Sequence, residues 1–342
     1  MSPDIVSKRS RRHRLEDVAR SAGVSKSIAS RVLNSDPELL VRPETRERVL
    51  RAAHDLHYRP HAAARGLKRA ETGAIGLLVP PLTNPVYVRI IRGAVERALA
   101  RDFVVLLAED LDSGRADETA QRLVQAGRID GLIVASARPG HPVLRSLRRE
   151  GVPHVFVNRG VSRSGRNVVM NDARASAVAL DHLAALGHER VGHVAGPREL
   201  DTARRRAAGF RKHATRLGLD VDVAEGDFQE TGGAKAGRAL LERSPDLTAL
   251  YASTLSQAVG LLHVAWELGL RVPADLSVVA YDDMPLADYL RPPLTTVRMP
   301  LAELGAAAVD ALLEQLLGGE AHDVTVETEP EVIVRGSTAP PP

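Results

Sequence analysis

Three side chains near the N-terminus, Lys26, Ser27 and Arg31, have the types and the spacing to read DNA base edges. Apolar residues recur at helical spacing through 26–33, so these polar side chains share the other side of one short helix. An arginine there could bond bidentately to guanine, while Ser25 and Ser30 could contact phosphates, which position a protein without specifying a sequence. The alternative for this pattern is an ordinary helical hairpin with a solvated polar face.

Signals for catalysis or metal binding are weak elsewhere in the chain. His188 and His193 are five residues apart and enter an expected strand, so they do not share one helix face as zinc ligands would. Asp181 and His182 fall inside an expected helix and have no evident nucleophile partner. No GxxxxGK loop, no GxGxxG after a strand and no GxSxG elbow occurs. We therefore expect no enzyme, no catalytic residues, no metal and no cofactor.

Two short helices and a tight turn must position the candidate DNA-reading side chains. Segments 15–22 and 26–33 have helical apolar spacing, and Gly23 between them can adopt the positive φ at which the first helix stops. Ser25 is placed to cap the second helix. A third helix is expected from Pro43 to about Leu56. The pattern predicts an all-α helix-turn-helix head whose second helix can lie in the major groove.

The charge distribution separates a basic head from an acidic body. Residues 1–70 contain 16 Lys and Arg against 8 Asp and Glu, whereas the remaining residues contain 30 against 35. A basic segment on an acidic body is typical of a polyanion-binding head. The chain has no cysteine, no apolar run that approaches a membrane span and no secretory signal. We expect a cytoplasmic, nucleoid-associated protein with no membrane partner.

After Gly73 the pattern changes to alternating strands and helices, which predicts doubly wound parallel sheets. The number of strands suggests two such lobes. Strands are expected near 74–79, 103–108, 131–135, 153–157, 190–195, 248–252 and 276–281. Helices are expected near 86–100, 116–126, 173–186, 203–217, 234–243, 257–268 and 301–317.

The order LEDVARSAGVSKSIASRVLN, RPETRERVLRAAHDLHYRP, AAARGLKR resembles the head and hinge of the lactose-repressor/galactose-repressor (LacI/GalR) family of bacterial transcription factors. The resemblance continues to about residue 336. It implies a hinge helix at roughly 60–68 and a leucine, Leu67, that is wedged into the minor groove and kinks the DNA. The candidate DNA-binding residues are Ser25, Lys26, Ser27, Ser30, Arg31, Asn34, Arg59, His61, Ala64, Leu67 and Lys68.

The resemblance also implies the domain organisation. A helix-turn-helix domain would span 1–58, with a disordered basic arm at 1–13, and a hinge would span 59–72. The body would span 73–336, followed by a tail at 337–342. The body would be like a periplasmic binding protein, with three crossovers near 170, 299 and 325. Lobe 1 would cover about 73–170 plus 300–324, and lobe 2 about 171–298 plus 325–336.

Polar and aromatic residues at the carboxyl ends of the expected strands are candidates for an effector cleft. In the family, residues that match Arg206 and Asp282 commonly hold effector hydroxyls, although each candidate could instead be a salt bridge or a helix cap. Thr254 stands where the family often has part of an Asn-Asp pair, so the effector is less hydroxyl-rich, is contacted differently, or the site has decayed. The candidate effector-binding residues are Asn84, Tyr87, Asn158, Arg159, Asp172, Arg206, Phe228, Thr254 and Asp282.

These features together predict a homodimeric repressor that binds a pseudo-palindromic operator and responds to a small-molecule effector, a sugar or a related metabolite. The alternative is a solute-binding protein without a transcriptional role. No heptad stretch follows the body, which favours a dimer over a tetramer. The sequence leaves open the effector, the operator, the sign of regulation, and whether the effector releases DNA or helps to hold it.

Overall fold

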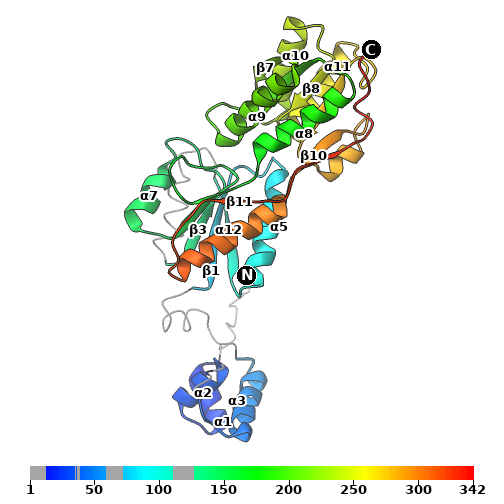
Figure 1. Cartoon of the computed structure of the whole chain (residues 1–342). Coiled ribbons are helices and arrows are strands. Elements are labelled where there is room, and N and C mark those ends of the chain that lie inside the picture. The colour runs from blue at the N-terminus through cyan, green and yellow to red at the C-terminus, as the bar shows by residue number, and fades with distance from the viewer. Residues whose placement is uncertain (1–12, 35, 37–38, 59–71, 111–126) are drawn as a thin grey trace, which may run out of the picture. The chain divides into compact units, whose positions relative to one another are not determined.

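The computed structural model describes residues 13–34, 36, 39–58, 72–110 and 127–342, and the chain divides into two units, Met1–Thr72 and Gly73–Pro342 (Figure 1). The first unit is the predicted helical head. It contains α1 (Leu15–Ala22), α2 (Lys26–Leu33) and α3 (Pro43–Asp55). Their apolar faces meet in a small core in which Val18, Ala29 and Val49 are fully buried. The head therefore folds around the apolar positions whose spacing predicted its helices.

Lobe 1 of the body is a six-stranded parallel sheet in the order β11-β5-β4-β3-β1-β2. Helices α5 and α12 lie side by side and pack together, and α12 also contacts β3, β4 and β5 (Figure 1). Residues of α7 pack in a separate cluster on the other face of the sheet. The elements of lobe 1 are β1 (Ala74–Val79), α5 (Val86–Leu99), β2 (Val104–Glu109), β3 (Gly131–Val134), α7 (Pro142–Glu150), β4 (His154–Val157), β5 (Asn167–Val169), α12 (Leu301–Leu316) and β11 (Val324–Thr325).

The contact between α5 and α12 depends on glycine. A Cβ at Gly93 would lie 1.9 Å from the carbonyl oxygen of Ala302, and a Cβ at Gly305 would lie 2.1 Å from that of Ile90. Only residues without a side chain permit this approach, so two glycines far apart in the sequence fix how closely the two helices pack.

Lobe 2 is a second six-stranded sheet in the order β12-β10-β9-β8-β6-β7, in which only the pairing of β12 with β10 is antiparallel. Its helices pack in pairs, α8 with α9 and α10 with α11. The elements of lobe 2 are α8 (Asp172–Ala185), β6 (Arg190–Ala195), α9 (Asp201–Leu217), β7 (Asp220–Glu225), α10 (Glu230–Arg243), β8 (Ala249–Ala252), α11 (Leu255–Glu267), β9 (Ser277–Tyr281), the 3-10 turn η1 (Pro285–Asp288), β10 (Thr295–Arg298) and β12 (Glu331–Ile333).

The chain passes between the lobes three times: after β5, between β10 and α12, and between β11 and β12. The final residues are bonded into lobe 2, since the hydroxyl of Ser337 donates to the carbonyl of Val278 and His188 bonds the carbonyl of Ala339. His188 also bonds Thr248, so it acts as a structural histidine.

The predicted fold class is confirmed, but the sequence did not reveal every element. It missed α7 and the strands β5, β7, β10, β11 and β12. Three of these strands have only two or three residues, and β7 reads DVDVAE at the edge of its sheet. The apolar pattern of such segments is too short or too polar to predict a strand, and they adopt strand conformation because they pair with a neighbouring strand. The helix expected at 116–126 lies outside the described residues.

Candidate functional site

The candidate DNA-reading helix, α2, is fixed at its start by the turn before it. Gly23 adopts the left-handed conformation (φ 64°), and its N–H bonds the last carbonyls of α1. The Ser25 hydroxyl then caps α2 by accepting from the N–H of Ile28 at 3.2 Å. Arg48 of α3 donates to the carbonyl of Ala22, which ties the turn to the third helix. The sequence therefore encodes both the stop of α1 and the start of α2.

The predicted reading residues lie on the outer side of α2. Ser25, Lys26, Ser27 and Asn34 are exposed, and Ser30 and Arg31 are half-buried. Asn34 donates to the hydroxyl of Ser30 at 3.4 Å. The other DNA-binding candidates, Arg59, His61, Ala64, Leu67 and Lys68, lie outside the described residues.

The two cations of this surface are each paired with a carboxylate of the same head. Lys26 Nζ lies 2.7 Å from Glu16 Oε1, and Arg31 Nε lies 2.7 Å from Asp36 Oδ2. The hydrogen bond from Lys26 holds the pKa of Glu16 below its usual value.

A cavity of about 540 Å³ lies between the lobes, at the carboxyl ends of the strands. Four predicted effector residues line it: Asn84, Tyr87, Arg159 and Phe228. Asn84 also fixes the start of α5, because its Oδ1 accepts from the N–H of Val86 at 3.1 Å. Phe228 offers aromatic surface from lobe 2, which suits an apolar ring face, and the largely buried Tyr87 lines the cavity from lobe 1.

Four other candidates, Asp172, Arg206, Thr254 and Asp282, form a buried layer of lobe 2 behind this wall. Asp172 accepts from Arg206 Nε at 2.8 Å and from the Tyr281 hydroxyl at 2.7 Å, and Arg206 also donates to the carbonyl of Ser253 at 2.6 Å. The Arg206 guanidinium stacks on the Tyr281 ring, 3.4 Å from its centroid. Burial acts to lower the pKa of Arg206, but Tyr281, Asp172 and Asp282 together raise it. Arg206 is thus held as a buried cation by a salt bridge, the structural alternative that the sequence left open.

Asp282 and Thr254 also lie in this layer. Asp282 is 3% exposed and has a positive φ of 77°, and its Oδ1 has no hydrogen-bond partner in the part of the chain that the structure describes. Burial raises the pKa of Asp282 to about 7, opposed by Arg206 and reinforced by Asp172. Thr254 caps α11, since its Oγ1 accepts from the N–H of Gln257 at 3.1 Å, and it donates to the carbonyl of Phe228. Thr254 therefore supports the loop that carries Phe228.

Arg205, which the sequence did not single out, ties the two lobes together at this layer. It donates to the carbonyl of Asn158 at 2.7 Å, to that of Met170 at 2.8 Å and to Asp201 Oδ2 at 2.8 Å, and it contacts Asp172. Asn158 is buried with a φ of 66°, and it takes part here through its backbone. Three consecutive arginines at 204–206 follow β6 at the start of α9, but nothing in the sequence showed which of them would reach the other lobe.

Lobe 1 also contributes a carboxylate that the sequence reading missed. Asp110 lines the cavity, and its Oδ2 lies 2.7 Å from His141 Nε2, while Oδ1 has no hydrogen-bond partner among the described residues. His141 Nδ1 accepts a hydrogen bond from the N–H of Val143. Nε2 therefore carries the ring proton and donates a hydrogen bond to Asp110. Burial acts to raise the pKa of Asp110, but His141 and Ser136 beside it outweigh burial and lower it. The position of Asp110 directly after β2 could have indicated this residue, because ligand-binding residues lie at the carboxyl ends of parallel strands.

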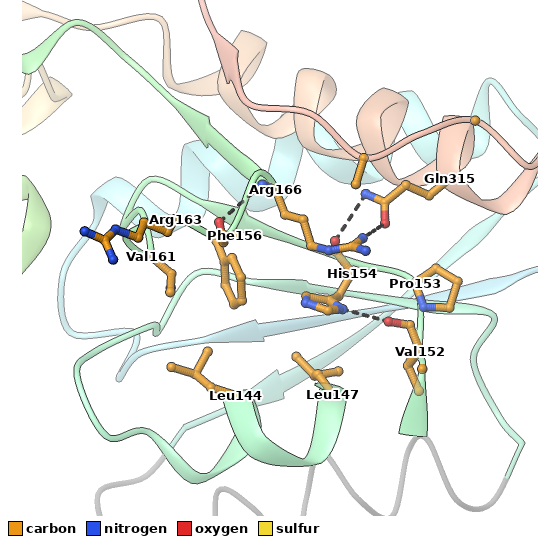
Figure 2. Close-up of a pocket in the computed structure, with 14 residues that line it drawn as sticks. Leu144, Leu147, Val152, Pro153, His154, Phe156, Val161, Arg163, Arg166 and Gln315 are labelled. Atoms are coloured by element: carbon orange, nitrogen blue, oxygen red, sulfur yellow. Dashed lines mark hydrogen bonds between the residues drawn. The ribbon is translucent and has the colours of Figure 1, made fainter. Parts of the chain in front are cut away.

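A second cavity, of about 590 Å³, lies within lobe 1 beside α7 and β4 (Figure 2). Figure 2 shows the rings of His154 and Phe156 on the side of β4 that faces Leu144 and Leu147. Arg166 donates to the side chain of Gln315, which closes the cavity toward α12. No predicted effector residue lines this cavity, so it is separate from the cleft.

Within the described ranges, no cluster of three or more His, Asp or Glu side chains could hold a metal ion. No helix in the same part of the chain is long and apolar enough to cross a membrane.

Comparison with known proteins decides the family. The model for "Bacterial regulatory proteins, lacI family" matches residues 14–61, and that for "Periplasmic binding protein-like domain" matches 180–338. The HTH-type transcriptional regulator MalR of Streptomyces coelicolor is 37% identical, over 96% of this chain and 97% of its own length. The chain belongs to the LacI family of bacterial regulators. This LacI-family protein is therefore a DNA-binding transcriptional regulator and not an enzyme, and the alternative of a solute-binding protein is wrong.

Solved LacI-family structures agree with this assignment. A lac repressor dimer bound to operator and an anti-inducer matches with a TM-score of 0.83 and 28% identity, over 96% of this chain and all of that chain. The regulator CelR in complex with cellobiose matches with a TM-score of 0.74 and 30% identity, over 95% of this chain and all of that chain. Regulators of this kind work in the cytoplasm.

Proposed function

We propose that this LacI-family protein is a repressor that binds a pseudo-palindromic operator as a homodimer and is controlled by a small molecule in the interlobe cleft. One observation carries the proposal: the same chain joins a capped helix, with Lys26, Ser27 and Arg31 on its outer side, to a body whose cavity is lined from both lobes. The working parts would be a DNA-binding domain at 1–58, a hinge at 59–72 and a body at 73–336. Binding to operator DNA would place the protein on the nucleoid.

The dimer and the operator follow from the comparison with the lac repressor, a dimer that was solved on its operator. Two copies of α2 would occupy two major-groove half-sites, so a two-fold dimer predicts a palindromic site. The resemblance assigns Leu67 to a minor-groove wedge between them. The wedge would kink the DNA, and the additional protein contacts that the kink permits would offset its free-energy cost.

The chemistry of the cleft favours a sugar or a sugar derivative as the effector. Arg159 supplies a guanidinium and Asp110 a carboxylate, and both groups form multiple charge-assisted hydrogen bonds with hydroxyls. Phe228 offers an apolar face, so the cavity combines ring surface with a few placed polar groups. CelR was solved with cellobiose, and a ribose operon repressor of Escherichia coli is 32% identical to this chain, which supports a carbohydrate.

Asp110 makes this proposal more specific. Thr254-Leu255 lacks the carboxylate of the Asn-Asp pair that the family often has there in lobe 2, and Asp110, whose side chain is buried beside His141, lines the cavity from lobe 1. Its lowered pKa keeps Asp110 ionised at neutral pH, so it accepts and does not donate. The ligand group that it recognises is therefore a donor, such as a hydroxyl, and His141 positions the carboxylate without needing to touch the ligand.

The DNA-binding half of the proposal is tested by selecting the full-length protein on a random duplex pool and sequencing the bound DNA. An enriched palindrome that is lost or broadened for Lys26→Ala and Arg31→Ala supports it, because these residues would make base contacts. Arg51→Ala is the matched control, since Arg51 is an exposed cation on α3. An unchanged selected sequence in both α2 variants contradicts the assignment.

The effector half is tested by titrating sugars against the protein on its selected operator. A sugar that alters operator affinity for the wild type should act at least about tenfold more weakly on Asp110→Asn or Arg159→Gln, the loss expected when a charged hydrogen bond is removed. Asp102→Asn, in the exposed turn after α5, is the matched control. Equal responses in all four proteins would place the effector elsewhere.

A further inference from the structure

Each of the two cations on the outer side of α2 is held by a carboxylate on a different flank of that helix. Glu16 belongs to the first turn of α1, and Asp36 follows the end of α2. Both salt bridges are short, with N···O distances of 2.7 Å. The carboxylates therefore reach the reading surface from two separate places in the chain.

The two salt bridges differ in exposure. The Lys26 and Glu16 side chains are 61% and 55% exposed, whereas those of Arg31 and Asp36 are 36% and 27% exposed. Asp36 is held in place by its own N–H, which donates to the carbonyl of Arg31 at 3.0 Å. The pair with Arg31 is therefore the more fixed of the two, and the pair with Lys26 is the more easily opened.

A cation in such a pair can contact a DNA phosphate only after its salt bridge is broken, which costs free energy. Binding to DNA without sequence preference comes almost wholly from cations that neutralise phosphates and release counterions. A carboxylate beside the cation removes that contribution and adds repulsion from the phosphate backbone. A guanine edge, in contrast, offers two acceptors in fixed positions, which a lysine or an arginine can engage in place of the carboxylate.

We propose that Glu16 and Asp36 are specificity-determining residues: as internal counter-ions they occupy the two base-reading cations of the free head and suppress binding to non-operator DNA. The proposal rests on the proposed function, in which Lys26 and Arg31 read bases. At the operator the base edges displace the carboxylates, and elsewhere the salt bridges persist.

The test measures affinity for a duplex without a palindrome across a series of salt concentrations, with the full-length protein. Each phosphate contact adds about 0.9 to the slope of log affinity against log salt, so freeing one cation per head should steepen the slope for a dimer by about 2. We expect this change for Glu16→Gln, with non-operator affinity raised roughly threefold or more and the operator preference reduced. Asp36→Asn removes one carboxylate from Arg31 and should shift the slope and the non-operator affinity in the same direction.

Glu47→Gln is the matched control. Glu47 forms a salt bridge of 2.8 Å with Arg51, so this variant makes the same charge change on α3 and frees a cation away from the reading helix. A thermal melt of each variant shows that the head remains folded. A slope that steepens equally for Glu47→Gln, or for none of the variants, overturns the proposal.

A double variant separates the pairing from a general effect of charge. In a Lys26→Ala background, Glu16→Gln should no longer steepen the slope, because no cation remains to be freed. Full steepening in that background also overturns the proposal. If Lys26→Ala and Arg31→Ala abolish operator selection while Glu16→Gln and Asp36→Asn leave the slope unchanged, the proposed function stands and this inference alone fails.

Discussion

Replacing Asp282 with asparagine should change how the stability of the protein depends on pH. The folded protein holds the pKa of Asp282 at about 7, against 3.8 for an unperturbed aspartate. Between these values the folded state binds the proton of Asp282 more tightly than the unfolded state, so the contribution of Asp282 to stability is highest below pH 3.8 and falls as pH rises toward 7. The wild type should therefore lose stability, relative to Asp282→Asn, as pH increases.

The size of the effect follows from the two pKa values. Raising the pH from about 5.5 to about 8 should destabilise the wild type by about 2 kcal/mol more than Asp282→Asn. His193, whose pKa burial lowers to about 3, has the opposite sign, since its contribution is lost as pH falls below its unfolded value. His193 is present in both proteins, so its contribution cancels in the comparison.

The assay is urea unfolding of both full-length proteins at several pH values in that range. Asp102→Asn is the control, because Asp102 lies exposed in a turn. This control reports the effect of removing an exposed carboxylate of the same type. A difference between Asp282→Asn and the wild type that is constant with pH would refute the reasoning, because it would mean that Asp282 titrates alike in both states.

Three further substitutions test the packing, the link between the lobes and the hinge. Gly93→Ala should lower the free energy of unfolding by about 1–3 kcal/mol, because the new Cβ would meet the carbonyl of Ala302, while Arg92→Ala on the exposed side should change little in the same urea titration. Arg205→Ala should cost about 1–3 kcal/mol in that assay, since it removes charged hydrogen bonds between the lobes; an unchanged midpoint would count against this link. Leu67→Ala should reduce both operator affinity and operator bending, measured by gel mobility of permuted fragments, and an unaltered bend would exclude the wedge.

The sequence predicted the elements whose patterns are local. The turn at Gly23 and the cap at Ser25 are decided by neighbours within a few residues, and both are confirmed. Long buried strands such as β1 and β6 carry their own apolar runs. The short strands β5, β11 and β12 have no such run, because pairing with strands from other parts of the chain forms them.

The candidate site was predictable in position but not in detail. The strand-end rule brought Asn84, Tyr87, Arg159 and Phe228 to one cavity. It could not show that Arg206 would be satisfied by Asp172, because that pairing depends on how α9 packs against α8. It also could not separate a residue that lines the cavity from one that lies behind it.

The division of lobe 2 into a wall and a layer behind it suggests how a ligand could act on the protein. The Phe228 ring packs so closely on Gly196 that a Cβ there would lie 2.0 Å from it, and the Arg206 guanidinium lies 5.9 Å from the ring centroid. A ligand in the cavity therefore meets Phe228 before it can reach Arg206. Thr254 donates to the Phe228 carbonyl and caps α11. Displacement of Phe228 would therefore disturb the hydrogen bonds at the start of α11. A ligand shifts a conformational equilibrium only through contacts that differ between the two states, and a displacement of Phe228 that opened Arg206 to the ligand would create such a difference.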